Sequence, residues 1–184
     1  MDKTETKIST EKTVKAHIFD LEIDTVRLPD GKTAPRDVIR HPGACCVVPL
    51  TDEGEIVCVR QFRYPFLTET LEIPAGKLDR TDGETPLSCA ERELKEETGA
   101  KAGEMIFLGE YWSSPAILDE RIYMYLARGL EFGEMSPDED EFIDTVRYPL
   151  DTLLSMILDG KVPDGKTQAA VMKAALLLAG EKQT

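Results

Sequence analysis

Residues 91–99, with the sequence ERELKEETG, carry four glutamates within nine positions. On a helix, Glu93 and Glu97 lie about one turn apart and about 40° from each other, and Glu96 lies about 60° from Glu93. Like charges at this spacing destabilise an isolated helix, whereas Mg²⁺ prefers several oxygen ligands such as carboxylates. The spacing therefore indicates either a divalent-cation site or a solvated acidic face, and helical geometry alone leaves both open.

A helix over residues 86–98 is predicted to position these carboxylates. Thr85 is the expected N-cap, Pro86 suits a first helical position, and Gly99 suits the C-terminal cap. Arg92 points away from the acidic edge and could hold a carboxylate of the preceding loop. Three apolar side chains form a stripe that we expect to face the core: Leu87, Ala90 and Leu94. The acidic edge adjoins this stripe instead of lying opposite to it.

Apolar alternation and short apolar runs predict a chain rich in strands. We expect strands at residues 13–27, 37–41, 43–50, 55–64, 67–76, 105–111, 121–127 and 144–149, and further helices at 150–158 and 166–178. The runs 43–50 and 55–64 are expected to pair as a hairpin across the turn TDEGE. Strands and helices interleave without regular βαβ alternation, which predicts a mixed sheet packed between helices.

The N-terminal region is expected to form a small β arm. Residues 1–12 are polar and are expected to begin as a frayed tail, and PDGK at residues 29–32 supplies a hairpin turn within the arm. We therefore divide the chain into an N-terminal tail and arm, residues 1–42, and a second domain, residues 43–184.

Composition excludes several classes of protein. A chain of 184 residues with 41% hydrophobic and 31% charged residues is typical of one globular domain. Its net charge of −13 argues against a nucleic-acid partner, and no apolar run is long enough for a membrane helix or a signal peptide. The four cysteines show no CxxC spacing and are expected to be buried free thiols: Cys45, Cys46, Cys58 and Cys89. We expect a cytoplasmic protein.

The segment GKLDRTDGETPLSCAERELKEETGA resembles the box of the Nudix hydrolase family: Gly, five residues, Glu, seven residues, then Arg-Glu-apolar-x-Glu-Glu-x-Gly-apolar. The matching positions are Gly76, Glu84, Arg92, Glu93, Leu94, Glu96, Glu97 and Gly99. Seven residues instead of five separate Gly76 from Glu84, which predicts a longer loop through RTDG, and the closing apolar residue is only Ala100. The resemblance implies an α/β/α sandwich with a mixed β-sheet and an N-terminal antiparallel arm.

Segments outside the box are similar to the ADP-ribose pyrophosphatase branch of that family: VRLPDGKTAPRDVIRHPGA, VRQFRYPFLTETLEIPAGKL and SSPAILDERIYMYLA. Pro115 follows Gly99 by sixteen positions, which matches a marker of the branch. The resemblance implies hydrolysis of ADP-ribose, a small nucleoside diphosphate substrate, to AMP and ribose 5-phosphate. It further implies dependence on Mg²⁺, with Mn²⁺ as an alternative, and a homodimer whose N-terminal arm pairs with the second subunit.

The resemblance also implies roles for the box residues. Glu93 and Glu97 would be the principal metal ligands, with Glu96 close to them and the backbone carbonyl of Ala75 as an additional oxygen. The remaining box residues would support this site: Arg92, Glu84, Gly76 and Gly99.

Residues outside the box receive roles from the same branch. The acidic loop SPDEDEFID would supply the general base, with Glu139 as first choice and Glu141 as second. Arg63 would meet a phosphate, Glu120 would accept from a ribose hydroxyl or order the metal site, and Arg36 would reach the adenine of the neighbouring subunit. Each of these residues has an ordinary surface ion pair or a solvated position as its alternative.

Three alternatives remain open. Trp112 and Phe62 are expected to pack in the core, although either could stack on a base. The same box chemistry would serve another nucleoside diphosphate sugar or a dinucleotide. A non-catalytic ADP-ribose sensor is disfavoured, because such modules often lack a box glutamate and carry a partner domain.

Overall fold

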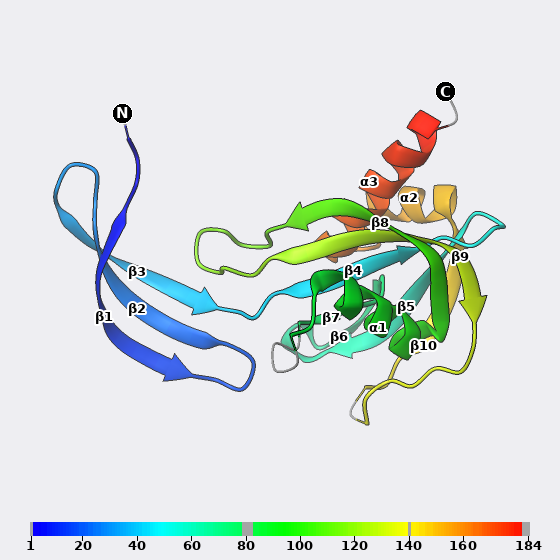
Figure 1. Cartoon of the computed structure of the whole chain (residues 1–184), viewed down its shortest axis with the longest axis horizontal. Coiled ribbons are helices and arrows are strands. Elements are labelled where there is room, and N and C mark those ends of the chain that lie inside the picture. Colours follow the sequence, from blue (N-terminus) through cyan, green and yellow to red (C-terminus); the bar gives the residue numbers. More distant parts are fainter. Residues whose placement is uncertain (1, 79–82, 140, 182–184) are drawn as a thin grey trace. The chain divides into compact units, whose positions relative to one another are not determined.

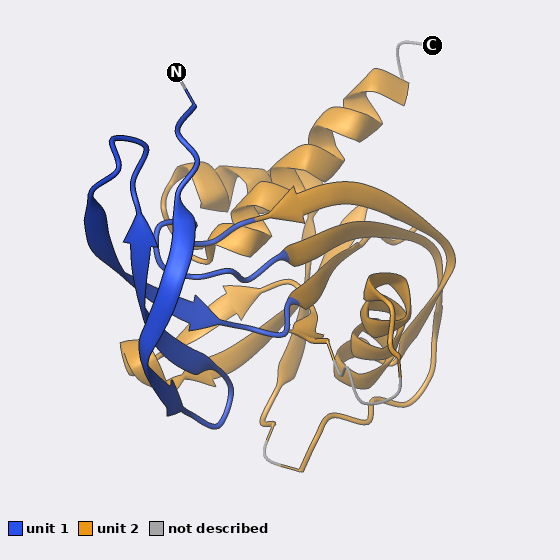
Figure 2. Cartoon of the chain, turned by 60° about the vertical axis from the view of Figure 1, so that its left-hand side comes forward, with its two compact units in different colours: residues 1–43, 112–121 blue, residues 44–111, 122–184 orange. Residues whose placement is uncertain are grey.

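The computed structural model of the protein describes residues 2–78, 83–139 and 141–181. The chain forms two compact units, one of Met1–Gly43 with Trp112–Arg121 and the other of Ala44–Tyr111 with Ile122–Thr184 (Figure 2). Residues 80–82, where the longer box loop was expected, lie outside the described residues.

The first unit is built on an antiparallel sheet in the order β1-β2-β3 (Figure 1). Its strands are β1 (Thr6–Lys15), β2 (Asp20–Arg27) and β3 (Thr33–Arg40). The frayed N-terminal tail was a wrong prediction for most of its length, because β1 begins at Thr6 and pairs with β2. Polar contacts accompany this pairing: the Thr10 hydroxyl donates to buried Asp24 at 2.7 Å, and Lys7 lies 3.0 Å from the same carboxylate. A polar sequence gives no apolar alternation from which such a strand can be predicted.

The described residues of the second unit form two sheets and three α-helices (Figure 1). A mixed sheet has the order β7-β4-β9-β8, with β7 (Ala75–Lys77), β4 (Ala44–Pro49), β9 (Ile122–Phe132) and β8 (Ala100–Tyr111). An antiparallel sheet has the order β10-β5-β6, with β10 (Asp144–Pro149), β5 (Glu55–Arg63) and β6 (Thr68–Glu72). The helices are α1 (Pro86–Thr98), α2 (Leu150–Leu158) and α3 (Gly165–Glu181), and a short 3₁₀ helix η1 (Tyr64–Phe66) joins β5 to β6.

The expected hairpin between residues 43–50 and 55–64 was a wrong prediction. β4 pairs with β7 and with β9, to which it is parallel, whereas β5 pairs with β6 and β10. Within the described chain, the two segments meet at the bridge between Leu50 and Ile56 and at the hydrogen bond from the Thr51 amide to the Glu55 carbonyl. Turn residues bring two strands close at one end, but they do not determine the neighbours of each strand along its length.

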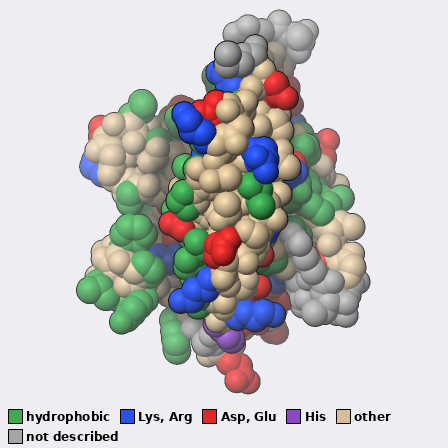
Figure 3. All heavy atoms as spheres, turned by 90° about the vertical axis from the view of Figure 1, so that its left-hand side faces the viewer, with side chains coloured by type: hydrophobic (Ala, Val, Ile, Leu, Met, Phe, Trp, Pro, Cys, Tyr) green, Lys and Arg blue, Asp and Glu red, His purple; other side chains and the backbone are tan. Residues whose placement is uncertain are grey.

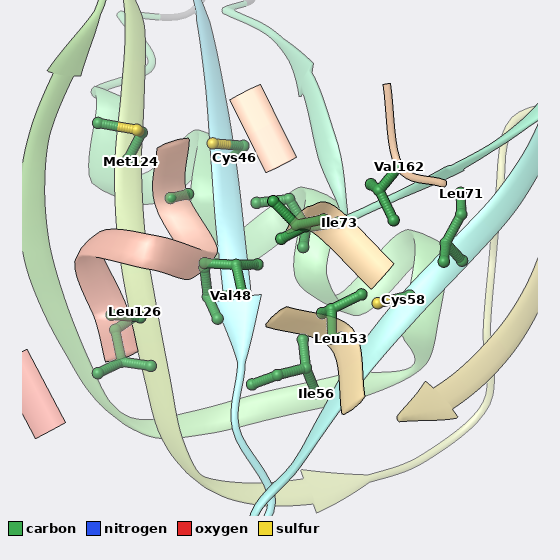
Figure 4. Close-up of a cluster of buried hydrophobic side chains, with 14 of the residues drawn as sticks. Cys46, Val48, Ile56, Cys58, Leu71, Ile73, Met124, Leu126, Leu153 and Val162 are labelled. Atoms are coloured by element: carbon green, nitrogen blue, oxygen red, sulfur yellow. The ribbon is translucent and has the colours of Figure 1, made fainter. Parts of the chain in front are cut away.

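The fully buried strand β4 divides the core between the two faces of its sheet. Cys46 and Val48 belong to a cluster that includes residues of α2 and α3 (Figure 4). Cys45 and Val47 belong to a second cluster with residues of α1. Because side chains alternate along a strand, α1 covers one face and α2 and α3 cover the other, which confirms the predicted α/β/α sandwich. The four cysteines are free and buried, as predicted.

One residue of the expected apolar stripe of α1 is not buried, and another residue takes its place. Ala90 and Leu94 are buried, but Leu87 is 41% exposed and Cys89 is buried in the core. Leu87 and Cys89 both lie in the first helical turn, and it is Cys89 that faces the core there.

Charged side chains of both signs lie interspersed on the face seen in Figure 3. Among the described residues, no helix is both long and apolar enough to cross a membrane.

Candidate active site

Helix α1 is fixed at both ends by its own sequence. The Ser88 amide donates to the Thr85 hydroxyl at 3.1 Å, and the Thr85 amide donates to the Ser88 hydroxyl at 2.9 Å, which forms a capping box. At the other end, Gly99 has a φ of 70° and its amide donates to the Lys95 carbonyl at 2.8 Å. These caps define the ends of the helix that carries Glu93 and Glu97.

Glu93 and Glu97 are buried against the backbone of β7. Their exposed fractions are 7% and 1%. The Ala75 amide donates to Oε2 of Glu97 at 3.3 Å, and a Cβ atom on Gly76 would lie 1.7 Å from Oε1 of Glu93. The first glycine of the box is therefore required by the close approach of a box carboxylate.

Burial makes these two carboxylates difficult to ionise. It raises the pKa of Glu93 to about 7, against the opposing charge of Arg92 and with further raising by the charges of Glu96 and Glu141. Burial raises the pKa of Glu97 to about 8, and the charges of Glu93 and Glu141 add to the effect. Two adjacent buried carboxylates, whose pKa values stay raised despite the charge of Arg92 beside Glu93, are an environment that a divalent cation would stabilise.

Arg92 is the cation among the box glutamates. Its Nε donates to Glu84 at 2.8 Å, and its Nη1 donates to Glu93 at 2.7 Å and to Glu96 at 2.8 Å. Glu84 is the carboxylate of the preceding loop that the sequence suggested for this arginine. The hydrogen bond to Glu84 is the largest of the effects that raise the pKa of Arg92. Arg92 thus binds one member of the buried pair, Glu93, together with Glu84 and Glu96.

The donor set fits a hard divalent cation, although the side chains are not gathered around one point. The described residues contain no group of three or more His, Cys, Asp or Glu side chains placed to hold a metal ion. The available donors are the carboxylates of Glu93, Glu97 and Glu96 and the carbonyl of Ala75, all of them oxygens of the kind that Mg²⁺ and Mn²⁺ prefer. Arg92 shares two of these carboxylates, so it must yield part of its contact when a cation binds.

The acidic loop that was expected to supply a base follows β9 in the chain, and its first residue is hydrogen-bonded to the last turn of α1. The Ser136 amide donates to the Glu96 carbonyl at 3.0 Å, and the Gly133 amide donates to the Gly99 carbonyl at 2.8 Å. Of the two candidate bases, Glu141 is half-buried and its charge raises the pKa of both Glu93 and Glu97. Glu139 is exposed.

Arg63, the expected phosphate ligand, forms an ion pair with the buried carboxylate of Glu72, which the sequence did not indicate as a site residue. Its Nε and Nη2 donate to Glu72 at 2.7 and 2.6 Å. The Thr70 hydroxyl donates to Glu72 at 2.6 Å, and Lys166 of α3 donates to it as well. Burial alone would raise the pKa of Glu72, but Arg63, Lys166 and Thr70 outweigh it and lower the pKa to about 2.

Three expected substrate residues lie in the first unit. Pro115 and Glu120 line a pocket of about 250 Å³ together with Val38 and Trp112. Glu120 accepts from the Ser113 hydroxyl at 3.0 Å, and its Oε1 lies 3.5 Å from Nδ1 of His41. Arg36 is paired with Glu5, at 2.9 Å through Nε and 2.5 Å through Nη2.

Trp112 and Phe62 are not core residues, which corrects the expectation for both. Trp112 is 54% exposed and Phe62 is 60% exposed. Trp112 lines the pocket of the first unit, where the guanidinium of Arg121 lies 5.7 Å from the centre of its ring. Trp112 precedes Pro115 by three residues, and this proximity in the sequence could have indicated that Trp112 lines the same pocket.

Comparisons with known proteins bear on the family and the fold of the chain. A model of the NUDIX domain matches residues 39–170. The chain is 42% identical to a methanol dehydrogenase activator of Bacillus methanolicus and 38% identical to an ADP-ribose pyrophosphatase of Bacillus subtilis (strain 168); each match covers 91% of this chain and 90% of the relative. An ADP-ribose pyrophosphatase of Mycobacterium tuberculosis is 34% identical over 96% of this chain and 86% of its own length. The fold matches a solved structure described as an ADP compounds hydrolase, with a TM-score of 0.85 and 22% identity over 98% of this chain and 97% of that one.

Proposed function

The chain belongs to the NUDIX domain family, and we propose that it hydrolyses the diphosphate bond of ADP-ribose to give AMP and ribose 5-phosphate. The observation that carries this function is the buried pair Glu93 and Glu97, held against Ala75 and Gly76 at the box positions of a capped helix. The choice of ADP-ribose is supported by the two pyrophosphatases that are 38% and 34% identical to the chain.

Hydrolases of this family generally depend on a divalent metal, and the donor set fits one. Glu93 and Glu97 would be its principal ligands, with Glu96 and the Ala75 carbonyl as additional oxygens. A bound Mg²⁺, or Mn²⁺ as the alternative, would neutralise phosphate oxygens and acidify the attacking water. Arg92 would hold Glu84 in place and limit the repulsion among Glu84, Glu93 and Glu96 before the metal binds, and it would give up part of its contact with Glu93 and Glu96 on binding.

We propose Glu141 as the general base, in place of Glu139, the first choice from the sequence, because Glu141 is half-buried and Glu139 is exposed. A base must reach the attacking water, and Glu141 is the candidate whose charge acts on both buried carboxylates. It would accept the proton of that water as the oxygen attacks phosphorus. The loop that carries both glutamates is held to α1 through Ser136, which gives it a fixed starting point.

The substrate would be held by charged and aromatic groups outside the box. Arg63 would donate to a phosphate of the diphosphate, and Glu120 would accept from a ribose hydroxyl. Pro115 and Trp112 would shape the pocket of the first unit for part of the nucleotide. Arg36 would reach the adenine bound by a second subunit, after exchanging its contact with Glu5.

A homodimer in the cytoplasm is part of the proposal. The first unit exposes apolar side chains on and beside its sheet, including Ile8, Val14, Ile18 and Phe19, which a second copy could cover. Four free thiols suit a reducing compartment. Sedimentation at micromolar concentration is expected to give about twice the chain mass of 20.5 kDa, and a mass equal to one chain would contradict the dimer.

The substrate itself is tested by a panel. ADP-ribose, a GDP sugar and a dinucleotide are compared at equal concentration with Mg²⁺, because GDP-mannose pyrophosphatases are 33% identical over 70% of the chain. ADP-ribose is expected to give the highest kcat/KM. A higher value for another compound would keep the hydrolase and change its substrate, whereas tight binding of ADP-ribose without turnover would identify a sensor.

A second candidate function follows from the relative with 42% identity, a methanol dehydrogenase activator. The chain would then raise the activity of a partner alcohol dehydrogenase through the same hydrolytic site. Adding the protein to a methanol dehydrogenase, with Glu97→Gln as the control, tests this function. Equal dehydrogenase rates with and without the protein would exclude it for that enzyme.

A further inference from the structure

The buried carboxylate of Glu72 lies between two cations from distant parts of the chain. Arg63, at the end of β5, donates from Nε to Oε1 and from Nη2 to Oε2, and Lys166, in the first turn of α3, also donates to Oε2. The Glu72 side chain is only 3% exposed, so it depends on these partners for compensation of its charge.

The two cations differ in their freedom to move. The Lys166 side chain is 12% exposed and also donates to Asp164 at 3.0 Å. Burial alone would lower the pKa of Lys166, but the carboxylates of Asp164 and Glu72 outweigh it and raise the pKa, so the ammonium group stays charged. The Arg63 side chain is 38% exposed. Lys166 is therefore the fixed partner of Glu72, and Arg63 is the partner that solvent and ligands can reach.

The first turn of α3 is hydrogen-bonded to the segment between β6 and β7. The Ile73 amide donates to the Thr167 hydroxyl oxygen at 3.0 Å, and the Thr167 amide donates to Asp164 at 3.0 Å. Ile73 lies two residues before Ala75, the candidate carbonyl ligand. The charge of Lys166 also lowers the pKa of Glu97, one of the proposed metal ligands.

We propose that Lys166 is a positioning residue: it remains on Glu72 and so allows Arg63 to exchange this carboxylate for a phosphate of the substrate. A buried carboxylate with a single counter-charge cannot release it without leaving an uncompensated charge, which is strongly unfavourable. With Lys166 in place, Glu72 stays compensated after Arg63 leaves. This inference rests on the proposed function of Arg63 as the phosphate ligand, and it assigns a role in substrate binding to the Asp164–Lys166–Glu72 group.

Steady-state kinetics with ADP-ribose and Mg²⁺ test the role of Lys166. In Lys166→Met, Arg63 is the only cation left on Glu72, so KM is expected to rise about tenfold while kcat changes less than about threefold. Lys166→Arg is expected to restore much of the loss. The matched control is Lys161→Met, because Lys161 pairs with Asp159 on the surface at 2.9 Å and is expected to leave both constants unchanged.

The double variant Glu72→Gln with Lys166→Met separates this role from a structural one. Removing the carboxylate together with its fixed counter-charge frees Arg63, so KM is expected to return toward the wild-type value. A purely structural role predicts that the double variant is at least as impaired as Lys166→Met. That result, or a Lys166→Met variant that loses kcat with an unchanged KM, would overturn the inference.

Chemical modification of Arg63 tests the inference without any substrate. Phenylglyoxal modifies accessible arginine side chains, and its rate at Arg63 is measured by peptide mass spectrometry in folded protein. The rate is expected to fall in Lys166→Met and to rise in Glu72→Gln, relative to wild type. Equal rates in the three proteins would overturn the inference, whereas a wild-type protein without turnover of ADP-ribose would overturn the proposed function alone.

Discussion

Gly76 of β7 packs so closely against Glu93 of α1 that a Cβ atom on Gly76 would lie 1.7 Å from Oε1 of Glu93. The first residue of the box and a carboxylate in the middle of its helix therefore pack directly against each other. This contact fixes the distance between the strand that carries the Ala75 carbonyl and the helix that carries the carboxylates.

Substitution of this glycine is expected to damage the site. In Gly76→Ala, the new methyl group must displace the Glu93 carboxylate, so kcat/KM is expected to fall by about a hundredfold or more while the protein remains folded. Gly180→Ala is the control, because nothing lies within 4 Å of a Cβ atom at that position. Equal kinetics for the two variants would contradict the close packing of Gly76 and Glu93.

Removing one buried carboxylate is expected to remove the metal. Glu97→Gln keeps the size and the burial of the side chain but loses its charge, so Mn²⁺ binding measured by calorimetry or paramagnetic resonance is expected to weaken at least about tenfold, with loss of turnover. Glu91→Gln, an exposed change on the same helix, is expected to leave both unchanged. Normal metal binding and turnover in Glu97→Gln would remove this residue from the ligand set.

Two substitutions in the acidic loop distinguish the candidate bases. Glu141→Gln is expected to lower kcat by about 10²–10⁴ with little change in KM, because a general base acts in the chemical step. Glu139→Gln is expected to change kcat much less, since Glu139 is exposed. If Glu139→Gln causes the larger loss, the base is Glu139 and Glu141 is not.

Stability without metal is expected to depend on pH in a direction set by the buried pair. Burial raises the pKa of Glu93 to about 7 and that of Glu97 to about 8 in the folded protein. The contribution of the two side chains to the free energy of unfolding is therefore fully present below about pH 4.5, the usual pKa of a glutamate. This contribution is lost as the pH rises through 7 and 8. Thermal unfolding in EDTA is expected to give a lower Tm at pH 8.5 than at pH 5.5.

Divalent metal is expected to reverse this trend, because it binds the ionised carboxylates. With excess Mg²⁺, the difference in Tm between pH 5.5 and pH 8.5 is expected to shrink or change sign. Glu97→Gln removes part of the trend in EDTA and serves as the control. A Tm in EDTA that rises from pH 5.5 to pH 8.5 would show that Glu93 and Glu97 are not the destabilising groups.

Features that depend on neighbours in the sequence could be predicted well. The caps of α1 follow from Thr85, Pro86 and Gly99, whose side chains or backbone freedom act within one helical turn. The strand Asp144–Pro149 and the helix Leu150–Leu158 agree with the expected bounds. Helical spacing also predicted that Glu93 and Glu97 adjoin the apolar stripe of α1, and both side chains are buried along that edge.

Features that depend on distant partners could not be predicted in this way. β4 and β5 flank a turn, but their sheet neighbours come from elsewhere in the chain, so turn chemistry predicted a false hairpin. β1 has a mostly exposed, polar face that gives no periodic signal. The pairing of Glu72 with Lys166 joins residues 94 positions apart, and nothing in either local sequence indicates the other.

Hydrolysis of ADP-ribose by the purified protein is the most direct test of the proposed function. The protein is mixed with ADP-ribose and Mg²⁺, and AMP and ribose 5-phosphate are followed by chromatography, with EDTA and Glu97→Gln as controls. Rapid release of both products in equal amounts is expected, and EDTA and the substitution are each expected to abolish it. Turnover that persists in EDTA, or a protein that binds the metal but releases neither product, would contradict the proposed function.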